Sequence, residues 1–252
     1  MLTLIGLGLK DEKDLSLRGL EVAKQADKAF IELYTSKWEG LERLEKLIGK
    51  RITRLKRKDL EQDSAKLLQH AKLSHVVLFV PGDPLVATTH TALVEEARKA
   101  GVAVDIIHNA SIISAIAETG LHVYRFGASA TIPFPEKTKG RLPESVYDVI
   151  KLNKSAGLHT LLLLDIADGK CMDAKEGIVK LLGIEETRKE GVFTPETEVI
   201  VFARAGAKDS RIWFGRVADL LKVDFGEPPM VLIVPGILHF TEKEYLEMFE
   251  IR

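Results

Sequence analysis

The chain has 252 residues, of which 46 % are hydrophobic and 29 % are charged, with a formal net charge of −1. This balance excludes a disordered chain and argues against a protein built to coat nucleic acid. No run approaches the ~18 consecutive apolar residues of a membrane-spanning helix, and the N-terminus lacks the features of a secretory signal. The single cysteine, Cys171, excludes an internal disulfide, so we expect a cytoplasmic protein.

Short apolar runs alternate with helical patterns through the first 120 residues. We expect strands at 2–9, 29–33, 52–55, 75–80 and 102–107. Between them, the spacing of apolar residues predicts helices at 17–26, 41–48 and 60–73, one ending at Gly101, and one running from Ser111 to about residue 120. Such a βαβαβ series predicts a mostly parallel sheet with flanking helices.

Composition changes at residue 121, so we divide the chain into an N-terminal α/β domain (1–120), a connection (121–143) and a C-terminal mixed α/β domain (144–252). The connection is rich in proline and has no helical period. In the last part we expect helices at 143–153 and 176–182, strands at 158–166 and 230–234, and a hairpin around 206–209. A capping box, Thr241-x-x-Glu244, predicts a terminal helix. The second sheet is therefore expected to contain antiparallel strands.

Three loops rich in small residues follow strands of the first sheet: Gly6-Leu7-Gly8, Gly82-Asp83-Pro84 and Ser111-Ile112. Ligands of open α/β sheets bind beyond the carboxyl ends of the strands, so the loops predict a shared pocket. We expect its wall to be mainly apolar, with Asp83 as the only formal charge and with Leu7, Leu9, Leu85, Val86 and Ile112 as lining residues. No phosphate-binding glycine loop is present, and such a wall suits a neutral or cationic ligand with an apolar body.

Other chemistry has little support in the sequence. The seven histidines show no zinc-ligand spacing, Cys171 is expected in a polar loop without a nucleophile motif, and no Gly-x-Ser-x-Gly motif occurs. We therefore expect no metal, and we identify no catalytic residue. The basic run at 51–58 is interpreted as a solvated edge, with an acidic or RNA-rich partner as the alternative.

Longer stretches match one known family. They include "LIGLGLKDEKDLSLRGLEVAKQAD", "ELYTS", "PGDPLVATTH", "SIISAIAETGLHVYRFG", "GLHTLLLLDI", "VFARAG" and "DFGEPPMVLIVPG". Across nearly its whole length the chain resembles the diphthine synthase family, which belongs to the tetrapyrrole-methylase-like class of S-adenosylmethionine-dependent methyltransferases.

The resemblance implies a two-domain α/β fold, a homodimer, and S-adenosylmethionine as cofactor, with S-adenosylhomocysteine as product. The implied reaction is trimethylation of the amine of a 3-amino-3-carboxypropyl group on a modified histidine of translation elongation factor 2, a step in diphthamide biosynthesis. No membrane or direct nucleic-acid contact is implied. Carried onto this chain, the implied cofactor contacts are Leu9, Asp83, Val86, Ser111, Ile112, Leu164, Ala205 and Val231.

Two alternatives stay open. One is a related methyltransferase that acts on ribosomal RNA or on a tetrapyrrole such as a corrin. The other is a non-catalytic homologue that binds the cofactor.

Overall fold

Contacts within the chain group its residues into two units, Met1–Ser114 and Ala115–Arg252. The computed structural model describes residues 1–141, 143–167 and 169–251. In these ranges no helix combines the length and the apolar character needed to cross a membrane.

The first unit is built on a five-stranded sheet in which every pair of neighbouring strands is parallel. The order across the sheet is β3-β2-β4-β1-β5. Its strands are β1 (Leu2–Gly6), β2 (Lys28–Glu32), β3 (Ile52–Leu55), β4 (Val76–Val80) and β5 (Val104–Ile107). The predicted parallel sheet is confirmed, although the first strand ends at Gly6 rather than at residue 9.

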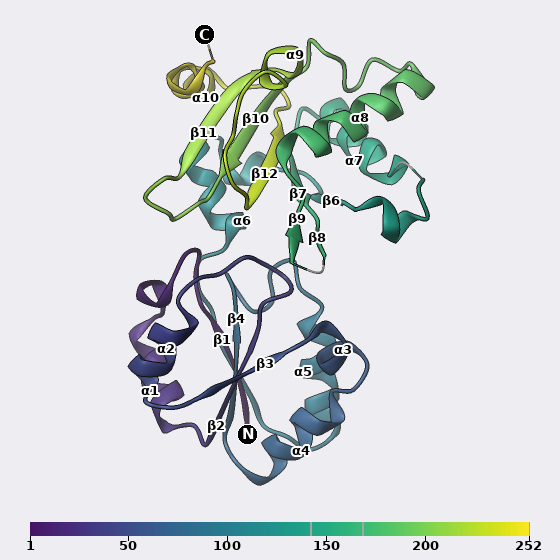
Figure 1. Ribbon diagram of the computed structural model, residues 1–252. Helices are drawn as coiled ribbons and strands as arrows, with labels where there is room; N and C mark the ends of the chain where they lie inside the picture. The colour runs from purple at the N-terminus through teal and green to yellow at the C-terminus, as the bar shows by residue number, and fades with distance from the viewer. Residues whose placement is uncertain (142, 168, 252) are drawn as a thin grey trace. The chain divides into compact units, whose positions relative to one another are not determined.

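Helices cover both faces of this sheet, because successive side chains of a strand point to opposite faces (Figure 1). On one face, Ile5 and Phe79 pack against α1 (Leu17–Gln25) and α2 (Leu41–Ile48). On the other, Leu4 and Leu78 pack against α3 (Arg57–Glu61), α4 (Ala65–Leu73) and α5 (His90–Lys99). A short 3₁₀ helix, η1 (Glu12–Asp14), follows β1.

Two helix predictions in this unit need correction. The expected helix at 60–73 is two helices, because Gln62 leaves the helical conformation with φ −125° and ends α3. The helix expected from Ser111 to residue 120 is the short α6 (Ile112–Ala115) followed by the 3₁₀ helix η2 (Ile116–Thr119).

The second unit contains a mixed sheet with the order β11-β10-β12-β7-β6. Only the β6–β7 pair is parallel; the others are antiparallel, as predicted. The strands are β6 (Ala130–Ile132), β7 (Thr160–Leu164), β10 (Glu198–Ala203), β11 (Arg211–Arg216) and β12 (Met230–Val234). Residues 121–143, expected as a connection, thus include a strand of this sheet, together with η3 (Val123–Arg125) and η4 (Pro135–Thr138).

Helices α7 (Glu144–Ser155) and α8 (Ala174–Arg188) pack on one face of the second sheet. The remaining elements are β8 (Ile166–Ala167), β9 (Lys170–Cys171), α9 (Val217–Leu220), α10 (Phe240–Leu246) and η5 (Glu247–Phe249). Cys171 therefore lies in a short strand, not in a loop. The predicted capping box is shifted by two residues, because the N-cap of α10 is His239 and its capping box uses Glu242.

Candidate active site

The loops after β1 and β4 are joined backbone to backbone. The N–H of Gly8 donates to the carbonyl oxygen of Gly82 at 3.2 Å, and the N–H of Gly82 donates to Gly8 at 2.8 Å. Both residues have positive φ angles, 75° and 70°, which glycine adopts without the steric cost of a side chain. Two of the three predicted loops therefore meet directly at the carboxyl end of the sheet.

Asn109 brings in the third loop, and the sequence prediction missed it. Its Nδ2 atom donates to the carbonyl oxygens of Gly6 and Asp14, each at 2.9 Å. A Cβ atom at Gly6 would lie 2.7 Å from both Asn109 Cβ and Gly82 O, so only glycine fits there. The sequence shows a polar residue shortly after an apolar strand, but it does not show which groups that residue bonds.

Asp83 is buried between the same loops. Its Oδ1 accepts from the N–H of Leu85 at 3.0 Å, and its Oδ2 accepts from the N–H of Asn109 at 3.2 Å and from His108 Nδ1 at 2.8 Å. This carboxylate braces the loops after β4 and β5. The prediction that Asp83 is the only charge at the site overlooked His108, whose imidazole becomes a second charge when protonated.

The predicted lining residues of the first unit divide into two groups. Leu9, Val86 and Ile112 are half-buried at this rim, and Ser111 is buried there with its Oγ accepting from the N–H of Ile113. Leu7 does not line a pocket: it is fully buried in the core with α1 and α2. The prediction that Leu7 lines the pocket was wrong. The chain stays extended past Gly6, and the Leu7 side chain is therefore directed into the core.

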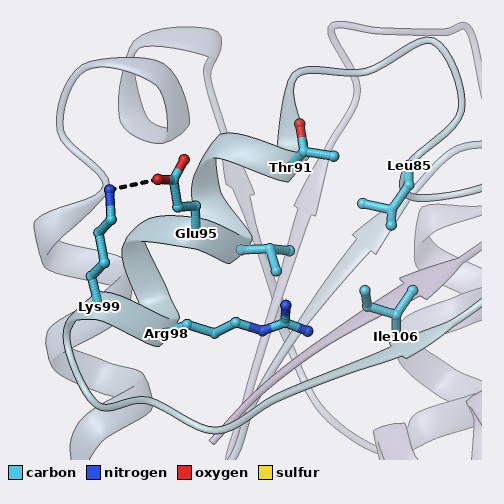
Figure 2. A pocket seen from close by; sticks show the side chains of 7 residues that line it. Leu85, Thr91, Glu95, Arg98, Lys99 and Ile106 are labelled. Carbon is cyan, nitrogen blue, oxygen red and sulfur yellow. Dashed lines mark ion pairs between the residues drawn. The ribbon is translucent and has the colours of Figure 1, made fainter.

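Leu85 faces a different hollow, between α5 and β5 (Figure 2). This hollow has a volume of about 450 Å³ and an apolar floor made by Leu85, Val94 and Ile106. Arg98 extends across it, and Glu95 and Lys99 form an ion pair at its edge at 2.5 Å. Leu85 therefore lines the hollow beside α5 and does not join the predicted lining residues at the rim.

A second polar cluster lies where β2 and β4 end. Glu32 is fully buried, and it accepts hydrogen bonds from the N–H groups of Tyr34 and Thr35 at 3.1 and 3.2 Å. Burial raises the pKa of Glu32, and the hydroxyl of Thr35 and a charge on His90 oppose that rise. His90 is also buried; its Nδ1 donates to the carbonyl of Pro84 at 3.0 Å, while Nε2 has no hydrogen-bond partner among the described residues.

In the second unit, Leu164, Ala205 and Val231 lie at one end of the mixed sheet. Val231 pairs with Leu163 on β7 and with Phe202 on β10. Leu164 is the next residue along β7, and Ala205 follows the end of β10. The structure thus brings together the predicted residues of each unit within that unit.

Two charged side chains stabilise this end of the second sheet. Arg204, at φ 53°, donates from Nη1 to the carbonyl of Phe225 at 2.9 Å and forms a 2.7 Å ion pair with Asp209. Asp165 is buried; it accepts from the N–H of Phe134 at 2.9 Å and pairs with Lys137 Nζ at 2.5 Å. Both lie next to predicted contact residues, Ala205 and Leu164.

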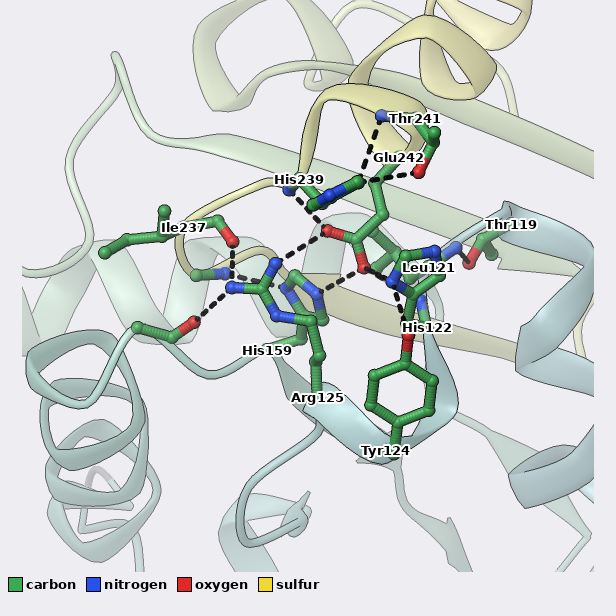
Figure 3. A network of polar contacts seen from close by, with 12 residues as sticks. Thr119, Leu121, His122, Tyr124, Arg125, His159, Ile237, His239, Thr241 and Glu242 are labelled. Atoms are coloured by element: carbon green, nitrogen blue, oxygen red, sulfur yellow. Dashed lines mark hydrogen bonds and ion pairs between the residues drawn. The ribbon is translucent and has the colours of Figure 1, made fainter.

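A further network in the second unit centres on the buried Glu242 (Figure 3). The backbone N–H groups of His122 and His239 donate to its carboxylate at 2.8 and 2.7 Å, and His159 Nε2 lies 3.1 Å away. Burial alone would raise the pKa of Glu242, but these hydrogen bonds hold it below its usual value. Burial lowers the pKa of His159. Glu242 therefore holds segments from both ends of the unit, and its role is structural.

No group of three or more histidine, cysteine, aspartate or glutamate side chains in residues 1–141, 143–167 and 169–251 is placed to hold a metal ion. The groups at the first unit's rim include backbone amides, apolar side chains, the Ser111 hydroxyl and the Asp83–His108 pair.

Comparison with known proteins gives the family. The family model of the tetrapyrrole (corrin/porphyrin) methylases matches residues 1–221. The chain belongs to this family. Diphthine synthases of Methanocaldococcus jannaschii and Methanococcus maripaludis are 44 % and 46 % identical to it over 98 % and 99 % of both chains. A crystal structure of diphthine synthase superimposes with a TM-score of 0.90 at 41 % identity, covering 99 % of this chain and 95 % of that one.

The family resemblance and the fold class predicted from the sequence are confirmed by these findings. As one of the tetrapyrrole methylases, the protein is a methyltransferase.

Proposed function

We propose that this protein is a diphthine synthase. It uses S-adenosylmethionine to methylate the amine of the 3-amino-3-carboxypropyl group on a modified histidine of translation elongation factor 2, a step in diphthamide biosynthesis. The observation that carries the proposal is the similarity to diphthine synthases over the full length of both chains. It acts in the cytoplasm as a homodimer.

The predicted contact residues of the first and the second unit have side chains that suit this cofactor. When bound, S-adenosylmethionine supplies a methyl group on a positively charged sulfur, so the protein need not provide a nucleophile. Leu9, Val86 and Ile112 offer apolar surface for the body of the cofactor, and Ser111 and Asp83 offer polar atoms for its ends. The sequence has no phosphate-binding glycine loop, which agrees with a cofactor that has no phosphate.

The second unit contributes the other proposed contacts, Leu164, Ala205 and Val231. These side chains are apolar, so this edge also favours a neutral, water-excluding surface. Exclusion of water protects the activated methyl group from hydrolysis and strengthens polar interactions near it. Holding the acceptor nitrogen in line with the methyl carbon is then the main task of the protein.

Methyl transfer to a primed protein substrate tests the proposal. Labelled S-adenosylmethionine should pass its methyl groups to elongation factor 2 that bears the aminocarboxypropyl histidine, and mass spectrometry should count up to three of them. Unprimed elongation factor 2 is the control. Labelling of ribosomal RNA or of a corrin, with none on the primed protein, would replace this function with one of the alternatives. Tight binding of S-adenosylhomocysteine without turnover on any acceptor would indicate a non-catalytic homologue.

A further inference from the structure

The acceptor amine of the proposed reaction needs a base. An alkyl amine has a pKa of about 10 and is mostly an ammonium ion at neutral pH, without the lone pair that must attack the methyl carbon. A base that removes this proton must lie within hydrogen-bond reach of the nitrogen and be accessible to the substrate.

His108 has the arrangement that a general base requires. It directly follows β5, its side chain is 68 % exposed, and its Nδ1 lies 2.8 Å from the Oδ2 of the buried Asp83. Because the carboxylate accepts, Nδ1 carries the hydrogen, and in the neutral imidazole Nε2 is left with a lone pair. A buried carboxylate that fixes the tautomer of an exposed histidine is the arrangement that many hydrolases use for their base.

Asp83 is suited to hold this imidazole in place. Two backbone N–H groups, of Leu85 and Asn109, fix its carboxylate. Its ion-pair partner in the described part of the chain is His108. The neighbouring acids are engaged elsewhere: Asp14 accepts from the N–H groups of Leu9 and Lys10, and Asp105 from that of Ile106. Asp83 is therefore free to orient the His108 ring through Nδ1.

The other histidines of the first unit lack one of these properties. His90 is buried, with its Nδ1 on a backbone carbonyl and not on a carboxylate. His75 bonds to Thr3 beside the start of β4, at the amino end of the sheet. His70 lies 2.8 Å from Lys28 Nζ, also at that end. Only His108 lies beside the Ser111 loop, at the rim where we place the cofactor.

We infer that His108 is the general base that takes the proton from the acceptor amine, with Asp83 as its positioning residue. This role rests on the proposed function. The proton passes from the substrate ammonium to His108 Nε2, and the N–H bond electrons stay on nitrogen as the lone pair that attacks. The imidazolium then releases the proton to solvent, to which the side chain is open. The cycle repeats before each methyl transfer, since each of the first two products is again an ammonium ion.

His108→Asn tests the role, because the asparagine amide can still donate to Asp83 but has no atom in place of Nε2. We expect the methylation rate on primed elongation factor 2 to fall at least about 100-fold at neutral pH, the usual scale for loss of a general base. The loss should shrink at high pH, where the amine loses its proton to water. Calorimetric affinity for S-adenosylhomocysteine should stay within twofold. For His108→Ala, free imidazole should restore part of the rate.

His70→Asn is the matched control and should keep the parent rate and pH profile. Asp83→Asn should give a smaller loss of rate, because His108 keeps Nε2 but loses the carboxylate that orients its ring. An active parent whose His108→Asn variant keeps the same rate and profile would overturn the role of His108 alone. A parent that binds S-adenosylhomocysteine but leaves the primed factor unmethylated would reject the proposed function, and this role with it.

Discussion

At the scale of single residues, hydrogen bonds between loops set the geometry of the rim. Asn109 links the β1 and β5 loops through two backbone carbonyls, and Gly6 has room for no side chain beside it. The sequence places Asn109 behind a strand but does not tell which loop it bonds. The same holds for His108, whose role depends on a carboxylate 25 residues away in the chain.

Asn109→Ala should weaken binding of S-adenosylhomocysteine about tenfold, or 1.4 kcal/mol, because the loops that carry Leu9 and Ser111 lose their link. Isothermal calorimetry measures the affinity. We also expect a loss of roughly 1–3 kcal/mol in the free energy of unfolding, as the carbonyls of Gly6 and Asp14 lose a donor.

Asn153→Ala provides the control. Asn153 is buried, whereas Asn109 is half-buried, and it donates to Ala128 O at 2.8 Å and to Thr160 Oγ1 at 3.0 Å, at the opposite end of β7 from Leu164. It should lose similar stability and keep its affinity for S-adenosylhomocysteine. Equal affinities in the two variants would show that Asn109 stabilises the fold without shaping the site.

At the scale of helices and strands, the sequence predicted the types of most elements because their apolar periods are strong. The break between α3 and α4 was missed because Leu60, Leu67 and Leu68 share one apolar face across it. The capping box predicted at Thr241-x-x-Glu244 lies two residues beyond the observed one, which joins His239 and Glu242. Tertiary burial selects Glu242, since Glu242 is buried and Glu244 is exposed.

Glu185 connects α8 to α7 and to the following loop. It accepts from Tyr147 Oη at 2.7 Å and from the N–H groups of Gly191, Val192 and Phe193. Burial would raise the pKa of Glu185, but these donors lower it to about 2 from the usual 4.5. A depressed pKa in the folded state stabilises the protein above about pH 4.5, and the stabilisation is lost as pH falls toward 2.

Glu185→Gln should therefore lower the free energy of unfolding by roughly 1–3 kcal/mol at pH 7. The difference in the free energy of unfolding between parent and variant should narrow as the pH falls from 4.5 toward 2, because the parent carboxylate becomes protonated. Urea unfolding at pH 7 and pH 3 measures both values. Glu186→Gln, at the exposed neighbouring position, should show no such narrowing. A gap that stays constant between the two pH values would contradict the assigned pKa.

At the scale of the whole molecule, each unit has its own core and its own group of proposed cofactor contacts. The fold class and the family followed from the sequence because motifs of both units are present in one chain. The composition change at residue 121 did not reveal β6, because its three residues become a strand only by pairing with β7. The proposed contacts in the second unit can be tested separately from those in the first.

Ala205→Trp places a large side chain beside Leu164 and Val231, at the edge of the second sheet. If this edge contacts the cofactor, calorimetry should give at least about a tenfold loss of affinity for S-adenosylhomocysteine, since an indole would occupy the volume of the ligand. Ala218→Trp is the control: Ala218 is also half-buried, but it follows the end of β11, and Arg216 there pairs with Glu198 at the start of β10. Unchanged affinity in Ala205→Trp, with the first unit's Asn109→Ala impaired, would restrict the cofactor site to the first unit, because only that unit's loops would then contribute to binding.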